Sequence, residues 1–448
     1  MPILCLDVGS TWTKGALVDA DGRLSGTAQH ATTPPEVCAG IDAVTAELGA
    51  AGAPVLACSS AGGGLRLAVV GQERLVSAEA AYRVALSAGA RVVHVSAGEL
   101  DGPGLRELRA ARPDVVLLAG GTDGGDTQVL LHNARRLAAN RIGCPIVLAG
   151  NASARDEAAE LLRAKGRTVI VTENVLPDVG ELAPGPARAA IRSVFLEHVI
   201  GGRGLSRGRR FARLVRTVTP DAVLVGVARL AALLAADEAS ESGAVLVTDV
   251  GGATTDVYSA VSAPAGPEQH AVALPADRRT VEGDIGMRWS APGVVAEALA
   301  ERLLTETEAD TLRPAARRRA HAVDFLPADA AETAVDTRIA ALAAILALRR
   351  HLRLVEGRLG PRGAALLVLS GGVFRHASPD QLSTVEEALR ADPLLRPVLR
   401  HARVMVDERY VLAPAGLLAE DEQAELADRL LRAALLAGQP EQHRLVGG

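Results

Sequence analysis

Cysteine is scarce in this chain of 448 residues, and the few cysteines are far apart. Cys5, Cys38, Cys58 and Cys144 show no C-x-x-C spacing. The cysteine spacing therefore indicates neither a zinc site nor a disulfide framework. It also leaves no evident pair of thiolate ligands for an iron–sulfur cluster. Because Cys5 and Cys58 fall within apolar, strand-like runs, we expect both to be buried as small hydrophobic side chains.

Long apolar runs and a surplus of basic charge are missing too. No apolar run approaches the ~18 residues of a membrane span, and the first residues lack the basic segment and cleavage site of a signal peptide. The formal net charge is −5, whereas a nucleic-acid binder usually carries a basic footprint. We therefore expect a cytoplasmic protein whose partners are proteins or small molecules, and neither nucleic acid nor a membrane.

The remaining composition is that of a folded protein, and the chain is long enough for two or three domains. Between about residues 90 and 175, strand-like runs alternate with helical stretches, which indicates parallel βαβ units. A proline- and glycine-rich region, 177–186, and an arginine-rich stretch, 203–216, mark a boundary. We predict an α/β fold with an N-terminal half, 1–215, that contains the βαβ region, and a C-terminal half, 216–448.

The sequence contains one internal repetition. Residues 7–14 are Asp-Val-Gly-Ser-Thr-Trp-Thr-Lys, and residues 249–256 are Asp-Val-Gly-Gly-Ala-Thr-Thr-Asp. Each segment follows an apolar strand and is typical of a tight turn whose glycines, backbone N–H groups and hydroxyls can surround a phosphate. An ordinary hairpin explains a single copy equally well, but two copies favour phosphate binding. The predicted phosphate-binding residues are Gly9, Ser10, Thr11, Thr13, Lys14, Gly251, Gly252, Ala253, Thr254 and Thr255.

Three carboxylates belong to these two turns. Asp7 and Asp249 would repel a phosphate directly, so we expect them to hold Mg²⁺ through its waters, because magnesium takes one or two carboxylates and keeps several waters. Asp256 is the third candidate catalytic residue, close to the attacking water. Lys14 is one of only two lysines in the chain. This is consistent with a compact ammonium placed against phosphate, and a chance surface lysine is the alternative.

The two turns resemble the phosphate-1 and phosphate-2 motifs of the superfamily that contains actin, sugar kinases and heat-shock chaperones. Residues 368–374, Val-Leu-Ser-Gly-Gly-Val-Phe, resemble its adenosine motif. The resemblance implies two ribonuclease-H-like, actin-like ATPase domains around a cleft for ATP and Mg²⁺. Residues 280–287, which include Gly283 and Asp284, resemble the stretch that precedes a nucleotide-side helix in the chaperones. The residues implied near the adenosine are Gly371, Gly372 and Val373.

The segment 220–236 resembles the connecting helix of the same superfamily. Its apolar positions recur at helical spacing, Pro220 suits a first helical turn, and we expect Thr219 to cap the helix. In the chaperones a glutamate stands where this chain has Thr219. The residue that positions the attacking water is therefore left open.

Over almost its whole length the chain resembles the GlmL/MutL family, accessory proteins of adenosylcobalamin-dependent glutamate (methylaspartate) mutase. This resemblance implies an ATP-binding and slowly hydrolysing chaperone that reactivates the mutase by helping it exchange damaged cobalamin, with a homodimer as one possible form. A small-molecule kinase of the same fold and a filament-forming actin-like ATPase are the alternatives. The resemblance rests on the segments 6–14, 58–65, 117–126, 173–177, 247–257 and 282–287.

The glycine-rich segment 117–126 has two interpretations. A strand, a glycine loop and a helix in this order describe a phosphate site at a helix N-terminus. Asp123 and Asp126 could instead cap the helix that begins near Gly125, and we favour this second interpretation. The loop at 59–64 can be explained equally well by turn chemistry or by a position in the cleft.

The predicted roles of the two turns imply that their three carboxylates differ in function. Asp7→Asn and Asp249→Asn keep the side-chain shape but remove charge, so the tightening of ATP binding by Mg²⁺ should fall. Asp256→Asn should spare binding and slow hydrolysis by ~10²-fold or more, whereas Gly252→Val should damage both. ATP titrations with and without Mg²⁺, together with phosphate release, measure these effects. Wild-type behaviour of all four folded variants would show that the turns are only hairpins.

Overall fold

The computed structural model describes residues 1–9, 11–33, 35–61, 65–73, 76–87, 90–200, 210–236, 244–261, 277–355, 359 and 363–436. Predictions for Ser10, for residues 62–64 of the 59–64 loop and for residues 203–209 of the arginine-rich stretch lie outside these ranges. No helix among the described residues combines the length and apolarity needed to cross a membrane.

Two mixed sheets share one strand order. In each sheet three consecutive strands pair antiparallel, and two further strands lie parallel to the first of them. This is the arrangement of a ribonuclease-H-like domain, and its occurrence twice confirms the predicted fold class. The first sheet is β10 (Val215–Val218), β4 (Val55–Ser59), β1 (Ile3–Val8), β2 (Trp12–Val18) and β3 (Leu24–Ala31). The second is β13 (Asp277–Glu282), β12 (Thr255–Val261), β11 (Ala244–Val250), β14 (Leu366–Ser370) and β15 (Arg403–Val406).

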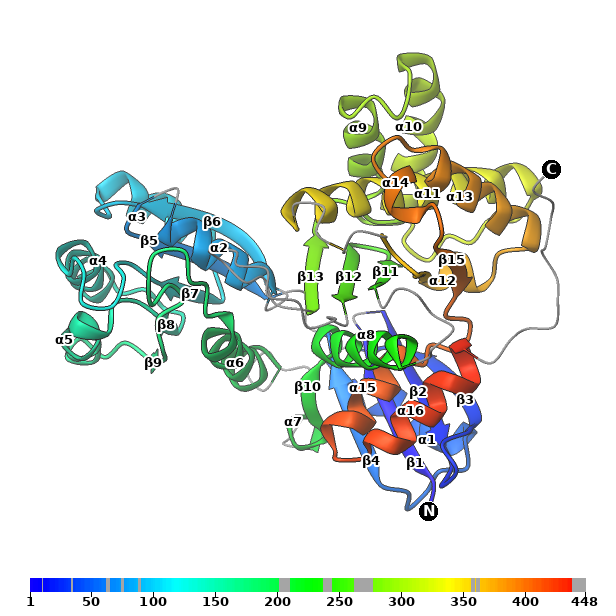
Figure 1. Cartoon of the computed structure of the whole chain (residues 1–448), viewed down its shortest axis with the longest axis horizontal. Helices are drawn as coiled ribbons and strands as arrows, with labels where there is room; N and C mark the ends of the chain where they lie inside the picture. The colour runs from blue at the N-terminus through cyan, green and yellow to red at the C-terminus, as the bar shows by residue number, and fades with distance from the viewer. Residues whose placement is uncertain are drawn as a thin grey trace.

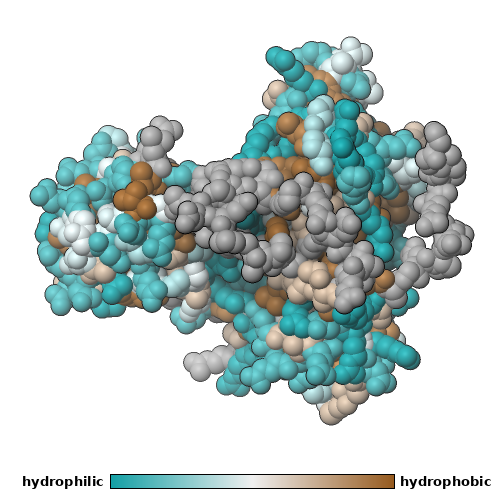
Figure 2. All heavy atoms as spheres, in the orientation of Figure 1, coloured by the Kyte–Doolittle hydropathy of each residue, from teal (hydrophilic) through white to brown (hydrophobic). Residues whose placement is uncertain are grey.

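A third sheet is wholly parallel and forms an arm to one side of the other two (Figure 1). Its inner strands are almost entirely apolar, as expected for strands that helices cover on both faces, whereas one edge strand also carries His94 and Ser96. On the face drawn in Figure 2, the coloured surface of the arm is mainly hydrophilic. The strands, in spatial order, are β6 (Arg91–Ala97), β5 (Arg66–Gly71), β7 (Val115–Leu118), β8 (Ile146–Leu148) and β9 (Val169–Val171).

The helices cover the faces of these sheets. On the arm, α2 and α6 pack on one face and α3, α4 and α5 on the other. The arm helices are α2 (Ser77–Ser87), α3 (Gly102–Ala110), α4 (Gln128–Ala139), α5 (Ala152–Arg163) and α6 (Pro184–Val194), which a π-helical turn, η1 (Phe195–Ile200), extends. The others are α1 (Cys38–Glu47), α7 (Arg210–Leu214), α8 (Thr219–Ala235), α9 (Ala291–Ala300), α10 (Glu306–His321), α11 (Ala330–Leu354), α12 (Gly372–Arg375), α13 (Pro379–Ala391), α14 (Arg396–Leu399), α15 (Leu412–Glu420), α16 (Ala424–Leu431) and the π-helical η2 (Arg432–Leu436).

A layer of three helices, α8, α15 and α16, lies between the two mixed sheets (Figure 1). One hydrophobic cluster joins Cys5 and Cys58 of the first sheet, Val247 of the second sheet and the apolar side chains of these helices. Both cysteines are therefore buried, as predicted. The C-terminal helices thus pack against the first sheet, and the division into the halves 1–215 and 216–448 stays a proposal.

The start of α8 differs from the prediction in one respect. Thr219 is already the first helical residue, Val218 precedes it as N-cap, and none of the side chains that the structure describes caps the helix. The hydroxyl of Thr219 donates instead to Asp7 Oδ1 at 2.5 Å. The prediction that Thr219 caps α8 is wrong because Thr219 lies inside the helix, one position after the N-cap, and its hydroxyl proton is donated to a charged acceptor, the Asp7 carboxylate.

Two glycines let α8 and α15 cross closely. A Cβ added to Gly226 would lie 2.1 Å from the carbonyl oxygen of Leu412, and one added to Gly416 would lie 1.8 Å from that of Ala222. Both obstacles are backbone atoms inside helices, so neither can move aside. Only glycine fits at these two positions.

The close crossing predicts the cost of a single methyl group. Gly416→Ala should lower the free energy of unfolding by roughly 1–3 kcal/mol or more, because overpacking forces the helices apart. Gly143→Ala is the control, since a Cβ there meets no atom within 4 Å. Thermal unfolding followed by circular dichroism compares the two variants. Equal melting temperatures would contradict the close crossing.

Candidate functional site

The two repeated segments form turns of the same geometry. In the first turn the N–H of Gly9 donates to the carbonyl oxygen of Trp12 at 3.0 Å, and in the second the N–H of Gly251 donates to that of Thr254 at 2.9 Å. A Cβ on Gly9 would lie 2.8 Å from the Trp12 oxygen, so this tight closure requires glycine. The hydroxyl of Thr32 also holds the first turn by donating to the Gly9 oxygen at 2.9 Å.

Strand alternation directs the carboxylates of both turns to the helix layer between the sheets. On β1, Leu6 packs in the outer core while Cys5 packs against α8 and α15, so Asp7 shares the face of Cys5. On β11, Leu246 faces the outer core and Val247 faces the helix layer, so Asp249 lies on the inner face as well. Asp7 and Asp249 therefore approach one layer from opposite sheets.

Asp7 is almost fully buried and receives donors from several elements. Besides Thr219, the hydroxyl of Tyr410 donates to Asp7 Oδ2 at 3.0 Å, and Lys14 Nζ lies 3.9 Å from the same oxygen. Lys14 Nζ also lies 3.5 Å from the centroid of the Tyr410 ring, a cation–π geometry. Burial and the charge of Asp7 raise the pKa of the Cys58 thiol well above its ordinary value. Cys58 is therefore a neutral neighbour that donates weakly to Asp7 Oδ1.

Burial raises the pKa of Asp249, and several neighbours modify this effect. The charge of Lys14 lowers the pKa and that of Asp256 raises it. A hydrogen bond from Ser370 lowers it and the charge of Asp7 raises it slightly. The two predicted magnesium carboxylates are therefore near enough to repel each other. A divalent cation would relieve this repulsion, and this donor set fits hydrated Mg²⁺.

Asp256 is paired with an arginine that the sequence analysis missed. Arg279 of β13 is buried, and its Nε donates to Asp256 Oδ1 at 2.8 Å while its Nη2 bonds to the same oxygen. The Thr254 hydroxyl lies 3.4 Å from the other carboxylate oxygen. No local feature of the sequence distinguished Arg279, because its role depends on the pairing of β12 with β13.

The side chains of Thr13 and Thr255 do not face an open site. Both residues are fully buried. Thr13 Oγ1 lies 3.1 Å from the hydroxyl of Thr32, and the Thr255 hydroxyl donates to the carbonyl oxygen of Ile285 at 3.0 Å. We had expected these two hydroxyls to contact phosphate. Instead, both bond to neighbouring protein groups and stabilise the turns from inside.

The predicted 280–287 stretch lies against the second turn. Met287 and Arg288 donate their N–H groups to the carbonyl oxygens of Gly251 and Gly252 at 2.9 and 2.7 Å. A Cβ on Gly286 would lie 2.5 Å from the Ala253 backbone. Of the two predicted residues in this stretch, Gly283 accepts a 3.4 Å hydrogen bond from Ser290, and Asp284 lies 3.3 Å from Arg350 Nη1.

The predicted adenosine motif, 368–374, spans the end of β14, which lies parallel to β11, and the start of α12. Gly371 has a φ of +117°, and a Cβ there would lie 2.4 Å from the carbonyl oxygen of Val250. Only glycine fits this position. Gly372 and Val373 open α12 directly after it. The motif therefore lies beside the end of the strand that carries Asp249.

A small cavity adjoins Asp7. Its volume is about 250 Å³, and Lys14, Tyr410, Arg375 and Arg409 are among its lining residues. Lys14, Arg375 and Arg409 are cationic, so this cavity suits an anionic group of a ligand. Tyr410 and Arg409 follow β15 in the second half, far along the chain from the first turn, and the sequence analysis assigned no role to either residue.

The glycine loop after β7 belongs to the arm, and its acids satisfy backbone donors. Asp126 Oδ1 accepts the N–H of Gln128 at the start of α4 at 3.1 Å. Asp123 Oδ1 accepts the N–H of Ala152 at 2.8 Å and an amide N–H of Asn174 at 2.9 Å. Capping therefore explains both acids, with one correction: Asp123 serves the start of α5, not of α4.

Asp407 supports the loop that carries Tyr410. Its carboxylate is buried after β15 and accepts the N–H groups of Val411 and Leu412 at 2.9 and 3.3 Å. Burial raises the pKa of Asp407 to about 6. The two N–H groups oppose this shift, and the charge of Asp249 adds to it. In the folded protein Asp407 therefore binds a proton more tightly than in the unfolded chain.

This pKa predicts a pH dependence of stability. Because the folded pKa is raised, the stability that Asp407 contributes is present at acid pH and is lost as the pH rises from about 4 to about 6. Over this window the free energy of unfolding of wild type should fall by roughly 2–3 kcal/mol relative to Asp407→Asn. Urea unfolding of both proteins at several pH values measures the difference. A difference that stays constant with pH would contradict the assignment.

The chain is similar in sequence to known proteins over almost its whole length. The family model of the MutL protein matches residues 3–435. The chain is 35% identical to Protein MutL of Clostridium tetanomorphum over 460 residues, which cover 96% of this chain and 97% of that protein.

Similar solved structures are much more distant. A nucleotide-free acetone carboxylase is 13% identical, with a TM-score of 0.40 and coverage of 94% of this chain and 70% of that chain. A ROK family glucokinase from Streptomyces griseus, in complex with glucose and AMPPNP, is 14% identical, with a TM-score of 0.33 and coverage of 95% and 99%. The match of the family model and the relative of similar length agree, and the chain belongs to the MutL protein family.

Proposed function

We propose that this protein binds ATP with Mg²⁺, hydrolyses it slowly, and uses the nucleotide to reactivate an adenosylcobalamin-dependent mutase, namely glutamate (methylaspartate) mutase. One observation carries the nucleotide part: two turns of the same geometry bring Asp7 and Asp249 together from two sheets of the same topology. The resemblance to mutase accessory proteins and membership of the MutL family support the mutase part.

In this proposal each part of the site has a separate task. Asp7 and Asp249 orient Mg²⁺ through its waters, and the metal, when bound, neutralises phosphate charge. Lys14 adds a positive charge beside Asp7. The turn residues Gly9, Thr11, Gly251, Gly252, Ala253 and Thr254 surround the phosphates, and Gly371, Gly372 and Val373 approach the adenosine.

The pairing of Asp256 supports slow hydrolysis. Arg279 neutralises much of the charge of Asp256, so this carboxylate orients a water better than it removes a proton from it. Thr219 has its hydroxyl bonded to Asp7 and cannot act as a strong base. A slow step suits a protein whose nucleotide switches a conformation, because the bound state then persists long enough to act on a partner.

The helix α8 offers a path from the nucleotide to the rest of the molecule. It begins with Thr219, whose hydroxyl bonds to Asp7, and it packs between both sheets. A change at Asp7 therefore acts on one end of a rigid element that contacts both halves. This is the structural requirement for a hinge that responds to the nucleotide.

The proposal predicts an ATP-dependent reactivation. Inactivated glutamate mutase should regain turnover when this protein, ATP, Mg²⁺ and fresh adenosylcobalamin are added together. Asp249→Asn should lose most of this activity, because Mg²⁺ no longer tightens ATP binding. Asp324→Asn, an exposed carboxylate in a loop between α10 and α11, should behave as wild type.

ATP binding is measured separately from reactivation. The only two tryptophans in the sequence flank the site, Trp12 in the first turn and Trp289 next to the 280–287 stretch, and both are exposed. Their fluorescence should respond to ATP with Mg²⁺, and calorimetry should give the affinity. Absence of binding to the folded protein would overturn the whole proposal, whereas binding without reactivation would remove the mutase as partner.

A further inference from the structure

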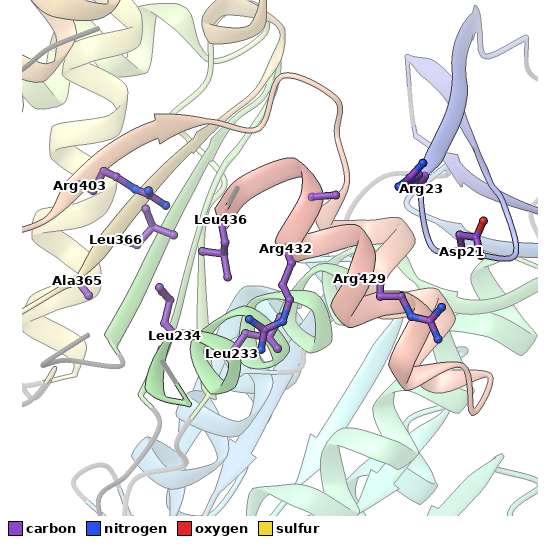
Figure 3. A pocket seen from close by; sticks show the side chains of 11 residues that line it. Asp21, Arg23, Leu233, Leu234, Ala365, Leu366, Arg403, Arg429, Arg432 and Leu436 are labelled. Atoms are coloured by element: carbon purple, nitrogen blue, oxygen red, sulfur yellow. The ribbon is translucent and has the colours of Figure 1, made fainter. Parts of the chain in front are cut away.

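A second cavity lies at the far ends of the elements that form the phosphate site. Its volume is about 610 Å³, which is within the range of ligand-binding clefts. Leu233 and Leu234 of α8, Leu366 of β14 and Leu436 of η2 give it an apolar floor (Figure 3). The floor therefore joins the central helix layer to the second sheet.

Four arginines surround this floor. Arg403 donates to the carbonyl oxygen of Leu435 at 3.0 Å, and Arg429 pairs at the surface with Glu425 at 3.2 Å. The side chains of Arg23 and Arg432 form no ion pair or hydrogen bond with any residue that the structure describes. Asp21 is the only acidic residue among the described lining residues. The cavity therefore has an excess of positive charge.

The arginines come from separate elements. Arg23 follows the turn between β2 and β3, Arg403 begins β15, Arg429 belongs to α16 and Arg432 begins η2. In Figure 3, Arg403 and Arg23 lie at opposite ends of the pocket with the leucines between them. A single small anion would reach only part of this rim, whereas an extended ligand with several carboxylates could meet all of it.

The cavity is connected to the phosphate site by rigid elements. The helix α8 runs from Thr219, beside Asp7, to Leu233, and 14 helical steps correspond to ~21 Å. The strand β14 runs from Leu366, at the cavity, to Ser370, whose hydroxyl bonds to Asp249. A molecule held here therefore contacts the ends of two elements whose other ends form the candidate nucleotide site.

We propose that this pocket binds an acidic, amphipathic peptide segment of a partner protein. Its apolar side chains would lie on the leucine floor, and its carboxylates would pair with the surrounding arginines. Charge complementarity selects this occupant, because a basic or wholly apolar segment would offer no acceptor to Arg23 and Arg432, whose side chains have no ion pair or hydrogen bond with a described residue. That the partner is the mutase rests on the proposed function, whereas the chemistry of the segment does not.

The test uses the full chain and a synthetic probe, without nucleotide or mutase. The probe is a fluorescein-labelled helical peptide of about 18 residues, with leucines on one face and glutamates on the other. Fluorescence anisotropy should show that the double variant Arg23→Glu, Arg432→Glu binds it ~10-fold or more weakly than wild type. The matched control is Arg317→Glu, an exposed arginine on α10, which should bind as wild type.

Three outcomes would overturn the proposal: no binding of the glutamate peptide, equal binding of a lysine version, or equal binding by the double variant and the control. A wild-type dimer that the double variant dissociates in sedimentation would assign the pocket to a second copy of this chain instead. Arg23→Gln with Arg432→Gln repeats the test if the glutamate variant is unfolded by circular dichroism. If the wild-type protein binds the peptide but does not bind ATP, the proposed function is wrong and the assignment of the pocket still holds.

Discussion

The hydrogen bond from Thr219 to Asp7 holds together parts of the chain that are 212 residues apart in sequence. It joins the first residue of α8 to the end of β1. The other oxygen of the same carboxylate accepts the hydroxyl of Tyr410, which is 403 residues away. Because Asp7 is almost completely buried, a lost donor would leave a buried charge poorly compensated. Hydrogen bonds to one carboxylate thus connect the two halves of the chain, and the other residues of the candidate site lie around Asp7.

The helix layer makes this convergence possible. The inner faces of both sheets pack against α8, α15 and α16, and strand alternation then brings Asp7 and Asp249 to the same layer. Gly226 and Gly416 let α8 and α15 approach closely, which keeps the sheets near enough for their turns to share an electrostatic environment. A larger residue at either glycine would act on the site through packing, without touching a ligand.

Buried carboxylates lie close together in this region, with cationic side chains beside them. Asp249 and Asp407 both have raised pKa values, to which burial contributes most, and each is raised further by neighbouring carboxylates. Lys14 lies beside Asp7 and its charge also lowers the pKa of Asp249, Arg279 pairs with Asp256, and the charge of Arg375 lowers the pKa of Asp407. A site in which buried carboxylates adjoin cationic Lys14, Arg375 and Arg409 suits a ligand that carries both a divalent cation and phosphate groups. This electrostatic pattern supports the proposed binding of ATP with Mg²⁺.

The sequence by itself determined the local features. Apolar alternation predicted the strands, the repeated Asp-Val-Gly turns predicted two equivalent domains, and the scattered cysteines gave no spacing typical of a zinc site or a disulfide framework. The tertiary structure decided which side chains of the turns are available: the hydroxyls of Thr13 and Thr255 are buried, Asp256 is paired with Arg279, and Tyr410 reaches Asp7. These pairings depend on strand register and on helix packing between segments hundreds of residues apart. Local propensity and spacing carry no information about such contacts, because they arise only when the two sheets close on the helix layer between them.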